Sequence, residues 1–285
     1  MLSEARFYRF AREERLFCAT LAHLLMQKGP NLQTFIDLIN ARLPGHPQIQ
    51  TDRPDEAQIY LEFTFLRDHW NRLGTNNDAK RGRIFELISK VEGLRRYTSE
   101  SFPIGIPEFN EYFVGERGRR IEYDIVYPGQ WSVGALRTRF GADREVFRDF
   151  CKFKWAFNIK PDMVILLPGS PPLSIEAKLE SKEGWYPAAF GERAIFDELF
   201  GVEKGRVGQI KLQRFMFEVL LGDPCRLVLI ARTRQPETKV DAFLTWREVF
   251  AALDFSSSIP HVHRLVEENS HLRLPQVRQG AAGQA

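Results

Sequence analysis

In the first third of the chain, apolar residues recur every three to four positions, which is the spacing of an amphipathic helix. This pattern predicts helices in four segments: residues 7–27, 32–43, 56–70 and 78–94. Asn31 stands directly before the second segment, where an asparagine side chain can cap a helix. We therefore expect a helical N-terminal domain over residues 1–96.

The pattern changes after Tyr97, where Pro and Gly become frequent and short apolar runs predict strands. The expected strands cover residues 120–127, 153–159, 162–167, 173–179 and 225–232. Helical spacing at residues 143–153 and 207–222 separates some of these runs. This mixture predicts an α/β (α+β) domain over residues 97–274, followed by a small, polar and disordered tail over residues 275–285.

The composition is that of a globular protein with a sizeable core, since 44% of the 285 residues are hydrophobic. Lys and Arg number 40 and Asp and Glu 37, so the net charge permits a nucleic-acid partner without requiring one. No stretch approaches the ~18 apolar residues of a membrane helix, and the charged N-terminus does not resemble a signal peptide. We expect a soluble protein.

The three cysteines are Cys18, Cys151 and Cys225. They are far apart in apolar surroundings, without metal-ligand spacing or a disulfide pattern, so we expect buried free thiols. Free thiols favour the reducing cytoplasm as the location.

The segment KPDMVILLPGSPPLSIEAKLE, residues 160–180, predicts an antiparallel hairpin. The prolines of its LPGSPP stretch cannot continue a strand, so residues 163–167 and 173–179 should fold back on each other. A turn centred near Ser170 would place Asp162 opposite Lys178 and Val164 opposite Glu176.

The strand period of two puts Asp162, Glu176 and Lys178 on one face of this hairpin. The opposite face would carry the apolar residues Met163, Ile165, Ile175, Ala177 and Leu179. Burying charges is costly unless they are paired, and two neighbouring carboxylates suit a hard cation such as Mg²⁺. A metal lowers the pKa of a bound water, and the lysine can position that water or help deprotonate it. The pattern indicates metal-assisted hydrolysis.

The residues Pro161-Asp162, followed after thirteen positions by Glu176-Ala177-Lys178, resemble the motif of the PD-(D/E)xK nuclease superfamily. The resemblance covers about residues 145–232 and implies a restriction-endonuclease-like mixed central sheet flanked by helices. It also implies that Mg²⁺ or Mn²⁺ is bound by Asp162, Glu176 and the backbone carbonyl of Ala177. Lys178 would then serve the attacking water.

The exonuclease-like branch of this superfamily often carries a glutamine followed four residues later by tyrosine. Gln213 followed by Phe217 is similar, with Phe in place of Tyr, and Gln209 one turn earlier is the alternative. The superfamily also often adds an acid from an upstream helix. Glu145 is the nearer candidate for that role and Glu86 the more distant one, whereas either could equally be a solvated helical glutamate.

Residues 137–160 contain seven basic and three acidic side chains, and clustered cations bind phosphates. Within this stretch we expect Arg148, Lys152 and Lys154 to contact nucleic acid, although an ordinary solvated face would look the same. Residues 115–120, GERGRR, are a second candidate.

These observations lead to two hypotheses. The first is a cytoplasmic Mg²⁺- or Mn²⁺-dependent endo- or exodeoxyribonuclease, acting in prokaryotic defence against foreign DNA or in DNA processing. In this hypothesis residues 1–96 form a homodimer or bind a partner protein. The second is a non-catalytic nucleic-acid-binding or interaction protein in which Asp162, Glu176 and Lys178 form a structural salt-bridge cluster. The sequence leaves open DNA versus RNA and endo- versus exonucleolytic action.

Overall fold

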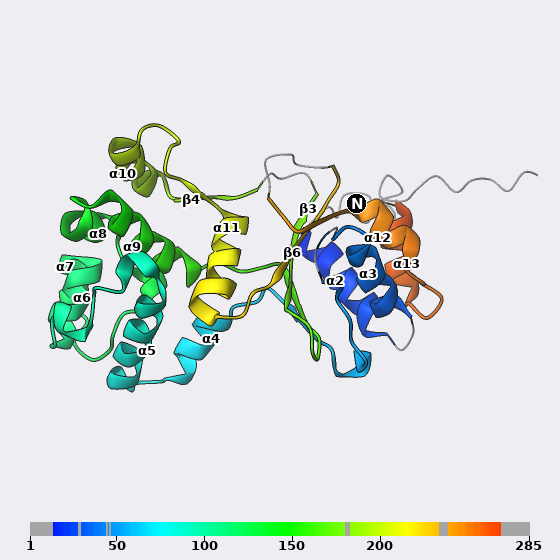
Figure 1. The fold of residues 1–285 in the computed structure, drawn as a ribbon, viewed down its shortest axis with the longest axis horizontal. Coiled ribbons are helices and arrows are strands. Elements are labelled where there is room, and N and C mark those ends of the chain that lie inside the picture. Colours follow the sequence, from blue (N-terminus) through cyan, green and yellow to red (C-terminus); the bar gives the residue numbers. More distant parts are fainter. Residues whose placement is uncertain are drawn as a thin grey trace, which may run out of the picture. The chain divides into compact units, whose positions relative to one another are not determined.

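The computed structural model describes residues 14–27, 30–43, 45, 47–179, 183–233 and 239–268, and Figure 1 shows its elements. The contacts divide the chain into two compact units. The first, called the sheet unit, comprises the described parts of Met1–Leu61, Asp162–Lys182 and Arg226–Ala285. The second, called the helical unit, comprises Glu62–Pro161 and Glu183–Cys225.

The sheet unit contains a five-stranded mixed sheet in the order β1-β2-β3-β6-β7. Its strands are β1 (Gln58–Leu61), β2 (Met163–Leu166), β3 (Leu173–Lys178), β6 (Arg226–Ala231) and β7 (Ala242–Thr245). The β1–β2 and β2–β3 pairs are antiparallel, and the β3–β6 and β6–β7 pairs are parallel. The predicted mixture of helices and strands is therefore confirmed, including the strands expected at 162–167, 173–179 and 225–232.

Helices α2 (Glu14–Met26), α3 (Asn31–Asn40), α12 (Trp246–Ala252) and α13 (Pro260–Glu268) complete the sheet unit with the short η1 (Pro54–Glu56). In Figure 1, α2, α3 and α12 lie together beside the sheet. Phe17 of α2 and Phe35 of α3 belong to one apolar core with Met163, Ile165 and Ile175 of the hairpin. The expected apolar face of the hairpin is confirmed, because Ala177 and Leu179 also belong to this core.

The expected domain boundary after residue 96 coincides with neither unit. Helices α2 and α3 share the core of the sheet, whereas Glu62–Pro161 belongs to the helical unit. An amphipathic pattern shows that a helix buries one face but does not show which element covers it. The tail expected at residues 275–285 lies outside the described residues.

The helical unit is built from eight α-helices among its described residues, namely α4 (Phe65–Arg72), α5 (Asn77–Lys90), α6 (Ile106–Val114), α7 (Glu116–Arg119), α8 (Val133–Phe140), α9 (Arg144–Ala156), α10 (Phe190–Phe200) and α11 (Gln209–Arg214). A π-helical segment, η5 (Phe215–Leu221), continues α11. Shorter elements are η2 (Glu92–Leu94), η3 (Ser99–Ser101), η4 (Pro128–Gln130) and the antiparallel strands β4 (Trp185–Tyr186) and β5 (Val207–Gly208). Stacked rings fill the interior, including Phe113 on Trp131 and Phe140 on Phe150.

Three of the predicted elements are wrong. Residues 56–70 do not form one helix, because Gln58–Leu61 pair with β2 as strand β1 and α4 begins only at Phe65. Residues 120–127 contain no strand, and most of residues 153–159 belong to the end of α9. Short apolar runs fit a buried helix as well as a strand, and tertiary packing decides between them.

The predicted cap of α3 is also wrong. The N-cap position is Pro30, and Asn31 is the first helical residue. The side chain of Asn31 instead donates hydrogen bonds to the carbonyl oxygens of Leu24 and Asp254 and accepts one from the Asp254 amide. It therefore joins α2 to the segment after α12.

Candidate active site

The β2–β3 hairpin pairs Met163 with Ile175 and Ile165 with Leu173, so its turn is centred on Gly169. The expected centre at Ser170 is wrong by one residue. Gly169 has a φ of +75°, in the left-handed region that favours glycine. Extending the observed register by one residue places Asp162 opposite Glu176, not opposite Lys178. The register difference is two residues, an even number, so the residues predicted to share a face still do.

Asp162 is fixed at the entry to β2 by the backbone of β3. The Ala177 amide donates a hydrogen bond of 2.8 Å to Oδ2 of Asp162. The amide and carbonyl of one strand residue point to the same side of the strand. The Ala177 carbonyl oxygen therefore points to the strand edge at which Asp162 lies.

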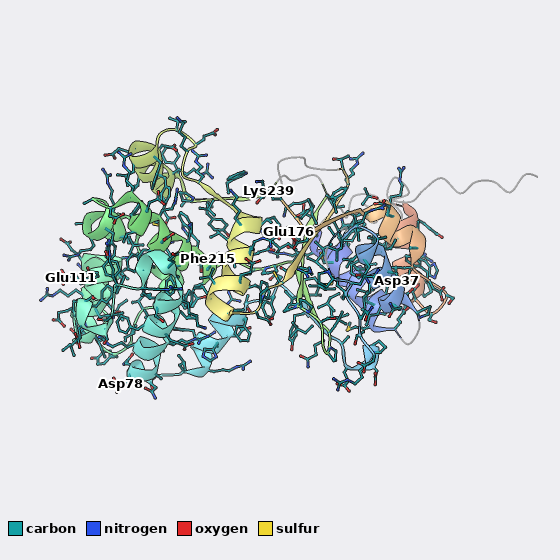
Figure 2. The ribbon with its side chains drawn as sticks, viewed as in Figure 1. Asp37, Asp78, Glu111, Glu176, Phe215 and Lys239 are labelled. Carbon is teal, nitrogen blue, oxygen red and sulfur yellow. The ribbon has the colours of Figure 1, made fainter. Side chains whose placement is uncertain are left out.

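Glu176 and Lys178 form an ion pair within β3, with 2.5 Å between Lys178 Nζ and Glu176 Oε1. Glu176 is only 1% exposed and Lys178 7% exposed. Figure 2 labels Glu176 on the sheet. Charges buried to this degree need an oppositely charged group nearby, because a buried ion without such a partner strongly destabilises the folded protein.

Glu14, the first residue of α2, is a third carboxylate at this site. Its Oε2 lies 3.7 Å from Lys178 Nζ, and its Oε1 accepts a hydrogen bond of 3.0 Å from the Leu179 amide. Trp246 of α12 contributes from a further element, since its indole N–H donates to the Lys178 carbonyl at 3.2 Å. The end of β3 is thus held by two helices.

The charges of these groups act on each other. Burial by itself would lower the pKa of Lys178, but the negative charges of Glu176, Asp162 and Glu14 outweigh it, so the pKa is raised above its ordinary value. Lys178 is therefore an ammonium at neutral pH.

The buried thiol of Cys18 on α2 responds to the same charges. Burial raises its pKa above the ordinary value, and Asp162, Glu176 and Glu14 raise it further while Lys178 opposes them. The balance of charge felt at Cys18 is negative. An environment of this sign favours a bound cation.

Among the described residues, no group of three or more His, Cys, Asp or Glu side chains is arranged to hold a metal ion. The set of metal ligands expected from the sequence contains only two such side chains, because its third member is a peptide carbonyl. Asp162, Glu176 and the Ala177 carbonyl fit a hard cation by their chemistry, since all three offer oxygen, and the remaining ligands of Mg²⁺ are usually water.

The other expected site residues belong to the helical unit. Gln213 of α11 is fully buried, and Phe217, four residues later, stacks on Phe63 at 5.9 Å between ring centres. The side chain of Glu145 is 69% exposed and pairs with Arg148, while Glu86 pairs with Arg83 and Lys90. Within the sheet unit, the structure brings together Asp162, Glu176, Ala177 and Lys178, and it adds Glu14.

The sequence did not indicate Glu14 or Trp246 as site residues. Glu14 lies in a charged run, where nothing distinguishes it from its neighbours. Its role depends on the packing of α2 against β3, which local periodicity does not specify. The only available signal was that Glu14 lies in the predicted helix 7–27, shortly before a strongly apolar run.

Each of the three basic residues expected to bind nucleic acid has a carboxylate partner. Arg148 pairs with Glu145, Lys152 with Asp149 at 2.8 Å, and Lys154 with Glu192 at 3.1 Å. Lys154 is also buried. These cations are thus partly neutralised within the helical unit itself.

No protein-family model, curated protein or solved structure matches this chain. The described part of the chain contains no helix with the length and apolar character needed to cross a membrane.

Proposed function

We propose that the chain is a nuclease of the PD-(D/E)xK type, with a restriction-endonuclease-like sheet, that hydrolyses phosphodiester bonds of DNA with Mg²⁺ or Mn²⁺. One observation carries this proposal: Asp162, which directly precedes β2, and Glu176 of the adjacent antiparallel strand β3 share a face with Lys178, and the opposite face of this hairpin is apolar core. Defence against foreign DNA or DNA processing in the cytoplasm is the proposed setting.

In this proposal Asp162, Glu176 and the Ala177 carbonyl hold the metal. The metal, when bound, would lower the pKa of a water and neutralise charge that develops on the phosphate. The Ala177 amide orients Asp162 through its hydrogen bond to Oδ2. Glu14 and Trp246 position Lys178 and the end of β3.

Lys178 is held beside the proposed metal ligands by its bond to Glu176. Its raised pKa belongs to the protein without metal, because Asp162 and Glu176, which raise it, are the carboxylates that a cation would neutralise. The proposal therefore assigns Lys178 to the attacking water, which it would position or help to deprotonate.

One observation favours the second hypothesis, a non-catalytic protein with a structural cluster. Lys178 bonds directly to Glu176 and also faces Glu14, so the ammonium group contributes to a compact ion network. This network would help to hold α2 on β3 even without any reaction. The two hypotheses differ in what a divalent metal does to the protein.

The test is to incubate the purified full-length chain with Mg²⁺, Mn²⁺ or EDTA and a panel of linear, circular and single-stranded DNA and RNA. We expect metal-dependent cleavage of DNA that Lys178→Met abolishes. Lys80→Met is the matched control, because Lys80 is also buried and lies 2.5 Å from a carboxylate oxygen, that of Asp124 in the helical unit. If the wild type cuts nothing and neither metal changes its thermal unfolding, the second hypothesis is favoured.

A further inference from the structure

Two arginines of the helical unit are stacked on one connected group of aromatic rings. The guanidinium of Arg96 lies 5.3 Å from the ring centre of Tyr97, and that of Arg139 lies 4.8 Å from the ring centre of Tyr112. Both tyrosine rings contact Phe140, with centres 5.4 and 6.0 Å away. We call Arg96, Tyr97, Tyr112, Arg139 and Phe140 the arginine–tyrosine cluster.

The rings beneath these arginines are packed against further aromatic residues. Phe140, at the end of α8, is buried and stacks on Phe150 of α9 with 4.1 Å between ring centres. Tyr112 of α6 packs edge-on against Phe102. Arg96 is further oriented by its hydrogen bond of 2.9 Å to Asp143. A guanidinium stacked on a ring keeps N–H groups in its plane for an oxyanion and loses less freedom when it binds one.

Positive charge is in excess around this cluster. Among the residues that the structure describes, Arg139 forms no ion pair with a carboxylate, and neither do the exposed Arg95 and Arg144, which are chain neighbours of Arg96 and Asp143. Counted with Asp143 and the exposed Glu92 and Glu100, which are near Arg95 and Arg96 in the sequence, these four arginines leave a surplus of one positive charge (4 − 3). Arg96 pairs with Asp143, and Arg148, Lys152 and Lys154 also pair with carboxylates, so the arginines here that keep a charge without an ion pair to another described residue are Arg95, Arg139 and Arg144.

We propose that the arginine–tyrosine cluster binds the phosphodiester backbone of a nucleic acid, which rests on the proposed nuclease function and names a surface for its substrate. Arg96 and Arg139 contact phosphate oxygens, and Arg95 and Arg144 add to the positive potential. The rings of Tyr97 and Tyr112 are occupied by guanidinium groups and Phe140, so they support the arginines and do not stack on bases. Contact with the backbone alone carries no sequence information. The cluster therefore binds DNA independently of base sequence.

The experiment measures binding of a fluorescent DNA strand by the full-length chain in EDTA, where no cleavage occurs, over a series of salt concentrations. Arg96→Ala with Arg139→Ala should raise Kd about tenfold or more. The slope of log K against log salt should fall by about 0.7 for each phosphate of a single strand that the variant no longer neutralises. Arg67→Ala with Arg72→Ala is the matched control, because it removes two exposed arginines of α4 in the same unit, and its Kd should stay within about twofold of the wild type.

The single variant Arg139→Ala keeps the proposal testable if the double variant fails to fold. Arg96 bonds Asp143, whose side chain caps α9 by accepting from the Val146 amide, so Arg96→Ala could disturb that helix. Arg139→Ala alone leaves this cap in place and should unfold at the wild-type temperature. It should still weaken DNA binding several-fold.

The outcomes separate the two proposals. Cleavage together with equal binding by the cluster and control variants would overturn the cluster and leave the nuclease in place. Cluster-dependent binding without cleavage in Mg²⁺ or Mn²⁺ would support the cluster and overturn the nuclease. Absence of DNA binding by the wild type in EDTA would overturn the cluster, whereas the nuclease is decided separately by cleavage in Mg²⁺ or Mn²⁺. If polyglutamate displaces the labelled DNA at the same concentration of charges as unlabelled DNA does, the surface binds anions in general. That result would also overturn the proposal that the cluster binds a nucleic-acid backbone.

Discussion

Lys178 Nζ lies 2.5 Å from Oε1 of Glu176, two residues earlier on the same strand, and both side chains are almost completely buried. Each charge therefore depends on the other for its stability. A substitution at either position changes the free energy of unfolding as well as any catalytic activity. Experiments on this site have to separate these two effects.

The first prediction concerns Lys178→Met. Removal of one partner of a buried ion pair leaves an uncompensated charge, here on Glu176, which typically costs about 3–5 kcal/mol of unfolding free energy. We expect a reduction of this order in urea unfolding, together with loss of cleavage.

Lys80→Met and a double variant provide the controls for this prediction. Lys80→Met should also destabilise the protein, because Lys80 is 3% exposed and pairs with Asp124, yet cleavage per folded molecule should remain. Lys178→Met with Glu176→Gln should recover stability without recovering cleavage. Recovery of both would show that the pair is structural only.

The second prediction concerns alkaline pH. The folded-state pKa of Lys178 is raised above the unfolded value of about 10.4, so its charge stabilises the folded state fully below that pH. This contribution is lost as pH rises through the raised pKa. The difference in unfolding free energy between the wild type and Lys178→Met should therefore be constant near pH 8 and should shrink above about pH 10.4. Urea unfolding of both proteins over this range checks the trend, and a difference that widens would contradict it.

The third prediction concerns the metal. A cation that binds only the folded state should raise the thermal unfolding temperature, with a gain of about 2.7 kcal/mol at a metal concentration one hundred times Kd. Asp162→Asn should remove most of this response. Asparagine keeps an oxygen that can accept the Ala177 amide, so the change removes charge while leaving that hydrogen bond possible.

Calorimetry with and without Mg²⁺ or Mn²⁺ measures this response. Asp52→Asn is the control in the same unit, because the Asp52 side chain is 90% exposed, and it should respond like the wild type. A metal-induced shift that survives Asp162→Asn combined with Glu176→Gln would place the metal elsewhere.

The pairing of Asp162, Glu176 and Lys178 on one face could be predicted because strand alternation does not change when a register shifts by two. The register itself could not, since the stretch LPGSPP permits more than one turn centre and the choice depends on the positive φ of Gly169. The face of a residue follows from strand alternation alone. The turn centre depends on backbone conformation, and several residues of the stretch could adopt the conformation required there.

Long-range pairing explains the remaining differences from the sequence-based expectations. The strand β1 is defined by its pairing with β2, about one hundred residues later, and its own four residues fit helical spacing equally well. Glu14 likewise enters the site only because α2 packs on β3. The sequence therefore predicted which charged residues of the hairpin share a face but not the elements that enclose them.

The last prediction concerns the N-terminal segment. If residues 1–96 formed a separate domain, as the sequence pattern predicts, a fragment starting near Tyr97 would keep metal-dependent cleavage. In the structure, α2 and α3 supply part of the core that covers Met163, Ile165 and Ile175, and β1 supplies the partner of β2. Deletion of residues 1–61 would expose this apolar face and an unpaired strand edge, which favours aggregation.

We therefore expect the chain from residue 62 onward to be insoluble or aggregated, as measured by light scattering after expression. Co-expression of residues 1–61 as a separate chain should restore solubility, because the two pieces together contain the complete core of the sheet unit. Rescue should fail when Phe17 and Phe35, both fully buried, are replaced by Asp in the small fragment. A soluble, cooperatively unfolding fragment from residue 62 without the small chain would instead show that the N-terminal segment is an independent domain, as its amphipathic pattern alone had suggested.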